Sequence, residues 1–354
     1  KYYKIIPNGI MNIKILGAKG DGVTDDSNVF QLAVNLFENL YIPKGVYKCN
    51  FNLNRKINLV GDGSIYTRLT PFDETKAVIT YKNSAPYWTY NTKFEKIGFY
   101  NINTDQSPKK TGVGFTFGYT NLDNHLQGTE FYTNVVFENC YFFGFEKAVL
   151  TPTGNIGVDF INCGGAGNKY AFYYIDARHY SEIMHAGCKT FYGGEFSGND
   201  ILFYIANKTD GFGQIIVRNA IIEGNKIVCY SENTVDLYTP IIFDGCWDEA
   251  NGSHQFPNQQ LTIDKWTGNT KTTQVVDVCT FIFKGVGQYI MTSGRYCEFN
   301  IDEKVSVVVK DSSVEEDGGY GGAVSTTNGG TIEYINCYSV SYFPKSAGMI
   351  VQNP

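Results

Sequence analysis

Five segments in the middle of the chain align residue by residue, and this repeat constrains the fold more than any other feature. Each begins at an aromatic or β-branched anchor, with Asn or Gly two positions later, a small residue three positions later and Gly or Ala seven positions later. The anchors are Phe137, Phe160, Phe191, Val217 and Phe243. The last three are evenly spaced, 26 residues apart. Eight positions after the anchor, four of the five segments have Asn: Asn168, Asn199, Asn225 and Asn251.

A repeat of this length predicts a solenoid, because one apolar strand cannot bury its face alone and stacks on its equivalents in neighbouring coils. Stacking brings equivalent residues to about 4.8 Å. Small residues, cysteines among them, then fill the narrow interior. The Gly-Asn pair predicts a tight turn, because both residue types tolerate a left-handed backbone, and stacked asparagines can bond along a ladder. A β-sandwich or jelly roll is the alternative, but it needs hairpin dipeptides between alternating strands, and few are present.

Residues 12–34, NIKILGAKGDGVTDDSNVFQLAV, predict a cap for this solenoid. We expect a short strand over 13–16, a glycine-rich turn, and a helix capped by Asp25 or Asp26, since a short carboxylate accepts from free N–H groups of the first helical turn. A strand is expected over 40–49. The apolar stripe of the helix is predicted from residues at helical spacing: Val29, Leu32, Ala33 and Leu36.

This opening segment closely resembles that of pectate-lyase-like right-handed β-helices, especially phage tailspike depolymerases and polysaccharide epimerases. The resemblance implies an all-β fold: a right-handed, single-stranded parallel β-helix with a short N-terminal capping helix. It divides the chain into a cap at 1–39, a β-helix at 40–300, and last coils or a C-terminal β region at 301–354. A further coil is expected near Ile335. In tailspikes the tail end commonly holds a trimer, so the resemblance implies a homotrimer.

The composition of the chain limits the classes of molecule that it is expected to bind. The net charge of −6 and a pI of about 5.3 argue against nucleic acid or an anionic membrane as the main partner. The 26 tyrosines suit either a sugar-binding surface or a tyrosine-rich solenoid exterior. Nine cysteines without a CxxC pair resemble small buried hydrophobes, which suits assembly in a reducing cytoplasm. We find no signal peptide, and a first residue other than Met suggests a piece of a longer protein.

One column of the repeat holds two glutamates at positions that suit acid–base catalysis. Glu223 and Glu249 stand six positions after their anchors, so they are predicted on adjacent coils beside the tight turn. Close like charges repel, so the pKa of one carboxyl should rise. A proton donor and an ionised partner are the pair that glycoside hydrolysis needs. Carboxyls roughly 5 Å apart suit retention of configuration and roughly 6.5–9.5 Å suit inversion; the sequence leaves both open.

Further acids are expected around the pair as catalytic candidates: Glu195, Asp244 and Asp248. Trp247 is a candidate sugar platform. Arg218 and Asp244 share a column on neighbouring coils, where they either contact substrate or form a surface ion pair. The alternative for the whole cluster is a solvated ladder edge whose charges discourage aggregation.

A second constellation lies in DARHYSEIMH, residues 176–185, where the repeat spacing stretches. Arg178, His179, Tyr180 and His185 include the parts of a lyase, because Arg neutralises a uronate carboxylate and His or Tyr takes the α-proton. The alternative is a polar loop whose histidines only form hydrogen bonds. No metal site or cofactor is predicted, although Asp244, Asp248, Glu249 and Arg218 could imitate a calcium-dependent lyase site.

The favoured function is a phage tailspike depolymerase that cleaves a bacterial capsule or O-antigen, a hydrolase acting from the virion tail at the host surface. The carboxylate pair and the resemblance together carry this prediction. Two alternatives stay open. One is a polysaccharide lyase or epimerase that uses the 176–185 loop, and the other is an appendage that binds a glycan without cleaving it.

Overall fold

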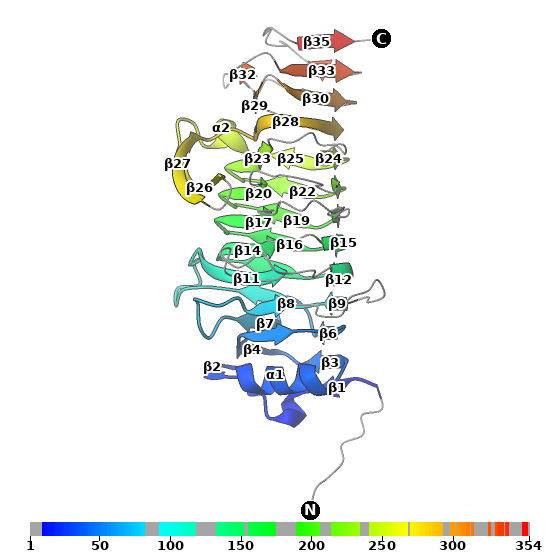
Figure 1. Ribbon diagram of the computed structural model, residues 1–354, viewed down its shortest axis with the longest axis vertical. Helices are drawn as coiled ribbons and strands as arrows, with labels where there is room; N and C mark the ends of the chain where they lie inside the picture. Colours follow the sequence, from blue (N-terminus) through cyan, green and yellow to red (C-terminus); the bar gives the residue numbers. More distant parts are fainter. Residues whose placement is uncertain are drawn as a thin grey trace, which may run out of the picture.

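Stacked coils form one long column in the computed structural model, from the cap at α1 to the last strand β35 (Figure 1). Each coil gives one strand to each of up to three parallel sheets, here named A, B and C. The structure describes residues 9–81, 92–117, 132–151, 155–174, 189–205, 214–233, 241–267, 270–292, 298–302, 304–311, 313–314, 325–326, 330–335, 337–339 and 349–352.

Sheet A comprises β1 (Met11–Asn12), β3 (Asn39–Ile42), β6 (Asn58–Gly61), β9 (Thr92–Glu95), β12 (Tyr132–Glu138), β15 (Asn155–Ile161), β18 (Lys189–Tyr192), β21 (Ile215–Arg218), β24 (Ile241–Asp244), β30 (Lys304–Lys310), β33 (Thr331–Ile335) and β35 (Met349–Gln352). Sheet B comprises β2 (Asp21–Asp25), β4 (Gly45–Lys48), β7 (Thr67–Thr70), β10 (Gly98–Tyr100), β13 (Tyr141–Phe143), β16 (Gly164–Ala166), β19 (Glu195–Ser197), β22 (Ile221–Glu223) and β25 (Trp247–Glu249).

Sheet C comprises β5 (Phe51–Leu53), β8 (Ile79–Tyr81), β11 (Thr111–Phe117), β14 (Phe145–Thr151), β17 (Tyr170–Tyr174), β20 (Ile201–Ile205), β23 (Ile227–Asn233), β29 (Phe299–Ile301) and β32 (Ser325–Thr326). The long strand β28 (Phe281–Thr292) serves two sheets, because its first half pairs with β23 in sheet C and its second half with β24 in sheet A. The remaining elements are η1 (Ile13–Leu16), α1 (Ser27–Leu36), α2 (Gly252–Gln255), the antiparallel pair β26 (Gln260–Thr267) and β27 (Thr270–Asp277), and the pair β31 (Ser313–Val314) and β34 (Tyr338–Ser339).

The anchors lie in register, which confirms the predicted coil alignment. Phe137 pairs with Phe160, Phe160 with Phe191, Phe191 with Val217, and Val217 with Phe243, all in sheet A. The fold is therefore the predicted right-handed parallel β-helix. The segment around Ile335 also joins sheet A, through β33, as a further coil.

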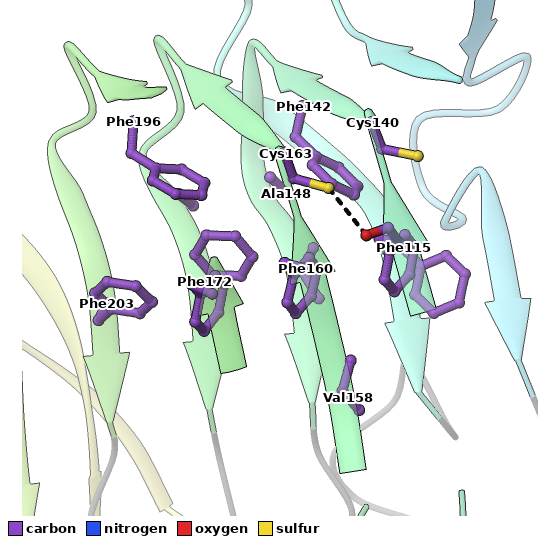
Figure 2. Close-up of a cluster of buried hydrophobic side chains, with 14 of the residues drawn as sticks. Phe115, Cys140, Phe142, Ala148, Val158, Phe160, Cys163, Phe172, Phe196 and Phe203 are labelled. Carbon is purple, nitrogen blue, oxygen red and sulfur yellow. Dashed lines mark hydrogen bonds between the residues drawn. The ribbon is translucent and has the colours of Figure 1, made fainter. Parts of the chain in front are cut away.

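The interior is a stack of aromatic rings (Figure 2). The rings of Phe160 and Phe191 stack with centroids 4.6 Å apart, and Phe172 meets Phe160 edge-on at 5.0 Å. Burial of each ring contributes about 1.5–3 kcal/mol to the stability of the folded state. Cysteines predicted to be interior are buried at the turn from sheet A to sheet B. The thiol of one of them, Cys163, donates to the carbonyl of Phe137 one coil earlier at 3.3 Å (Figure 2).

The predicted asparagine ladder forms at the turn from sheet B to sheet C. The Nδ2 of Asn168 donates to Oδ1 of Asn199 at 2.9 Å, and Asn199 donates to Asn225 at the same distance. Asn225 donates to Asn251 at 3.1 Å. The left-handed backbone, however, belongs to the residue that precedes each Asn, for example Gly224 with φ of 63°. The asparagine side chains instead point into the interior, where they are fully buried.

The cap differs from the prediction in its local structure. Residues 13–16 form the 3-10 helix η1 and not a strand. Asp25 accepts from the backbone N–H of Ser27 at 2.9 Å, the first residue of α1, so it takes the predicted capping role. Asp26 does not cap α1 through its side chain, because its carboxylate accepts from Lys19 N and Gly20 N and closes the glycine-rich turn.

The predicted apolar stripe of the cap helix is wrong by part of a turn. Phe30 and Val34 are buried together with Ala33, whereas Leu32 and Leu36 are 50% and 58% exposed. The reason is the ring of Phe30, which stacks on Phe51 at 4.9 Å and thereby sets the rotation of α1 on the first coil. The strand expected over 40–49 is two strands, β3 and β4, on different sheets.

The hairpin of β26 and β27 covers part of the outer face of sheet C. Beneath it lie four tyrosines that form a second apolar cluster with Ile263 of the hairpin: Tyr170, Tyr173, Tyr204 and Tyr230. Gln274 of β27 donates to Glu232 at 2.9 Å, which ties the hairpin to β23. These tyrosines are therefore core and not sugar-binding surface. Among the described helices, none is long and apolar enough to cross a membrane.

Candidate functional site

The two glutamates of the acid column meet on the outer face of sheet B. Glu223 ends β22 and Glu249 ends β25, and the two residues pair directly in the parallel ladder. Adjacent strands lie about 4.8 Å apart. Both side chains are exposed. The coil alignment therefore brings together two carboxylates that are 26 residues apart in the sequence.

Trp247 lies on the same face as the carboxylates. Its indole is 51% exposed, and its Nε1 donates to Oε2 of Glu249 at 2.9 Å. Ile221, which pairs with Trp247 from the preceding coil, is 42% exposed. An exposed indole, an exposed aliphatic side chain and two carboxylates thus form one continuous strip, which is the combination that sugar rings bind.

Glu195 extends the strip by one coil. It begins β19, pairs with Ile221 and is exposed. Its Oε1 accepts from the hydroxyl of Ser197 at 3.2 Å, and Ser197 pairs in turn with Glu223. Burial raises the pKa of Tyr141 to about 12, with smaller contributions from Tyr100 and from the charge of Glu195.

Arg218 and Asp244 form an ion pair at the end of sheet A, next to this face. Nε of Arg218 lies 3.2 Å from Oδ2 of Asp244, and the Thr292 hydroxyl donates to Oδ1 of Asp244 at 2.6 Å. Both charged side chains are roughly half exposed. The surface ion pair weighed for these residues is therefore present, and pairs of this kind contribute about 0–1 kcal/mol.

Asp248 does not lie on this face, so its predicted place among the surface acids is wrong. Successive residues of a strand point to opposite faces, and Trp247 and Glu249 both point outward. Asp248 continues the inner column of Phe196 and Ile222 and is 4% exposed. Burial raises the pKa of its carboxyl from 3.8 to about 7, although a hydrogen bond from Asn251 acts in the opposite direction.

The lyase constellation falls outside the described residues. Arg178, His179, Tyr180 and His185 all lie in 175–188, so the structure does not place them. A shared calcium site of Asp244, Asp248, Glu249 and Arg218 is excluded by geometry, because Asp248 faces the interior. Within the described ranges, no group of three or more His, Cys, Asp or Glu side chains is arranged to hold a metal ion.

Two exposed residues on or beside this face were missed from the sequence. Tyr192 is 50% exposed and pairs with Arg218 from the preceding coil, so it extends the strip along sheet A. Ile221 is the other. Both stand in columns that hold candidate residues in the repeat alignment, one position and four positions after the anchor. The repeat alignment therefore contains the signal for both Tyr192 and Ile221.

Comparisons with known proteins agree with this architecture. Residues 10–142 match the family model described as "Rhamnogalacturonase A/epimerase, pectate lyase-like". This part of the chain is similar to pectate-lyase-like proteins. This confirms the resemblance read from the cap, and the matched range extends from the cap through the first coils. No curated protein matches the sequence.

Three solved structures share the β-helix along almost the whole chain. The enzymatically active domain of bacteriophage CBA120 tailspike protein 4 superposes with a TM-score of 0.52, at 13% identity over 98% of this chain and 43% of that one. The catalytic unit of the α-1,3-glucanase of Streptomyces thermodiastaticus gives 0.50, at 13% identity over 98% and 68%. The Agl-KA catalytic domain gives 0.51, at 12% identity over 99% and 68%.

These likenesses are likenesses of fold. The chain spans 43–62% of the length of the phage structures that it matches. The identities are far too low to transfer a site residue by residue. The chemistry of this chain therefore has to be argued from its own side chains.

Proposed function

We propose that this β-helix belongs to a phage tailspike depolymerase that binds and hydrolyses a bacterial surface polysaccharide, a capsule or an O-antigen. The observation that carries the proposal is the direct pairing of Glu223 with Glu249 on an exposed strip beside Trp247. A solenoid face of this kind runs along the molecular axis, which suits a polymer with a repeating unit. The protein acts outside the host cell, at its surface, as part of the virion tail.

The hydrogen bond from Trp247 distinguishes the two carboxyls. The indole N–H orients the Glu249 carboxylate, so we assign Glu249 as the nucleophile or base. Glu223, which receives no side-chain hydrogen bond from a described residue, is the proton donor to the leaving oxygen. This division of roles is the one that glycoside hydrolysis needs.

Neighbouring residues position the chain of sugars in this proposal. Trp247 packs against a pyranose face, and Glu195 accepts from sugar hydroxyls one coil away. Arg218 and Asp244 already hold each other at 3.2 Å, so they form a polar rim that contacts substrate and takes no part in proton transfer. Arg178, His179 and Tyr180 are proposed to contact substrate.

The proposed active form is a homotrimer, held together by the region after residue 301. Light scattering of the purified chain measures this directly. A monomeric mass at working concentration contradicts this part of the proposal, and leaves the site within one subunit untouched.

The function is tested by incubating the protein with polysaccharide from a susceptible host. We expect new reducing ends without ultraviolet absorbance of an unsaturated product. Glu223→Gln and Glu249→Gln should each abolish this activity, whereas Glu146→Gln on sheet C is the matched control and should retain it. Absorbance of an unsaturated product supports the lyase alternative, which uses residues 176–185. Binding without any change in polymer size supports the non-catalytic appendage.

A further inference from the structure

The asparagine ladder has a direction and an end. Each amide donates its Nδ2 toward the next coil, from Asn168 to Asn199, to Asn225 and then to Asn251. In the described chain Asn251 is the last member, and its Nδ2 donates to Oδ1 of Asp248 three residues earlier, and to Ile222 O at 2.8 Å. A row of neutral amides therefore terminates on a carboxyl group.

Asp248 stands where the coil changes shape. β25 is the last strand of sheet B among the described residues, and in the next coil the single strand β28 runs from sheet C directly into sheet A. The turn after β25 thus has no described sheet B coil stacked on it from the C-terminal side. That turn includes Ala250 in a left-handed conformation with φ of 54°, where the three preceding coils have Gly. The link from Asn251 to Asp248 closes this turn from the inside.

The surroundings of Asp248 are apolar. Asp248 lines a cavity of about 10 Å³ together with Ile222, Phe243, Cys246, Phe281, Met291 and Thr292. Among these lining residues Cys246 is the one other titratable group, and burial raises the pKa of its thiol to about 11, so it stays neutral.

The charged side chains on the packed elements point away from Asp248 or are engaged elsewhere. Glu223 of β22 is exposed, and Asp244 of β24 pairs with Arg218. Glu298, next to β29, accepts from the backbone N–H of Ser253 in α2 at 2.9 Å. The state of the Asp248 carboxyl is therefore set mainly by burial and by Asn251.

We propose that Asp248 is a positioning residue whose buried carboxyl ends the asparagine ladder and makes the order of β25 depend on pH. The two side chains that flank it, Trp247 and Glu249, belong to the proposed site, so the consequence for catalysis rests on the proposed function. The protonated carboxyl is neutral and is accepted by the apolar interior. The ionised carboxylate is desolvated there, so β25 loosens as the pH rises through neutrality.

The direct test is a carboxyl carbon-13 NMR titration of the wild-type protein, which needs neither substrate nor a variant. We expect the Asp248 signal to titrate near pH 7. Hydrogen exchange across residues 247–251, corrected for the intrinsic pH dependence of exchange, should become faster between pH 6 and pH 8. A titration midpoint near the ordinary value of an Asp overturns the proposal, whatever the activity assays show.

Variants separate positioning from packing. Asp248→Asn keeps an acceptor for Asn251 but cannot ionise, so its corrected exchange should not change over the same pH range. Asp248→Ile copies Ile222 of the preceding coil and should also be insensitive to pH. Asp277→Asn, on the exposed hairpin, is the matched control and should behave like wild type. A wild-type pH response that survives in both Asp248 variants contradicts the proposal.

Discussion

Asn225→Ala removes the rung of the ladder with the most complete set of described contacts. The Oδ1 of Asn225 accepts from the backbone N of Asn199 at 3.1 Å and from its Nδ2 at 2.9 Å. Its own Nδ2 donates to Phe196 O at 2.9 Å and to Asn251 at 3.1 Å. The substitution therefore leaves two N–H donors of Asn199 facing a dry void.

Each buried group left unsatisfied costs about 1–3 kcal/mol, so the free energy of unfolding should fall by about 4 kcal/mol. The assay is equilibrium unfolding in urea followed by circular dichroism, with hydrogen exchange to show that the loss centres on the coils of β19, β22 and β25. Asn35→Ala on the exposed face of α1 is the control, and should change stability by no more than about 0.5 kcal/mol. A fall below about 1 kcal/mol for Asn225→Ala would show that the ladder does not hold the coils in register.

Four further predictions follow from the same coils. Glu223→Gln and Glu249→Gln should each reduce kcat on a cleaved polysaccharide by about 10²–10⁴-fold, with thermal stability retained. Trp247→Ala should raise KM roughly tenfold, equivalent to about 1.4 kcal/mol of binding, which a titration with inactive enzyme would check. Ala250→Gly should raise the unfolding free energy by about 1 kcal/mol, because the left-handed backbone strains alanine. Because the pKa of Asp248 rises from 3.8 to about 7 on folding, wild-type stability should fall by about 4 kcal/mol as the pH rises from 4 to 8, and this fall should be absent in Asp248→Asn.

The coil register is predictable because the repeat is expressed in columns. Phe191, Val217 and Phe243 differ in type, yet they share neighbours at fixed offsets, and these offsets locate the turns. The same columns predict that Glu223 lies beside Glu249, and the pairing of β22 with β25 confirms it. A solenoid stacks equivalent positions of successive coils and thereby constrains the residues at those positions. The stacking can therefore be predicted from the sequence.

The errors arise where a local pattern is interpreted without the packing around it. The charge of Asp248 suggests that it lies on the surface with Trp247 and Glu249. Strand alternation instead points its side chain inward, beside the column of Phe196 and Ile222. Spacing alone assigns Leu32 to the buried face of the cap helix. The ring of Phe30, whose partner Phe51 lies in a later strand, decides that rotation instead.

Two features have no local signal at all. The strand β28 pairs in two sheets without interruption. Its length does not show that it replaces a turn between two sheets. The hairpin of β26 and β27 buries Tyr170, Tyr204 and Tyr230 against Ile263. Their burial depends on a segment that follows the last of them by some thirty residues, which periodicity within a coil does not report.

A crystal structure of Glu223→Gln with an oligosaccharide of the proposed surface polymer is the most direct test of the proposed site. We expect a sugar ring against Trp247 and a glycosidic oxygen within hydrogen-bonding distance of residue 223, with the Glu249 carboxylate beside the same sugar. An oligosaccharide bound with its cleavable bond away from sheet B, while this strip stays empty, would contradict the proposed site.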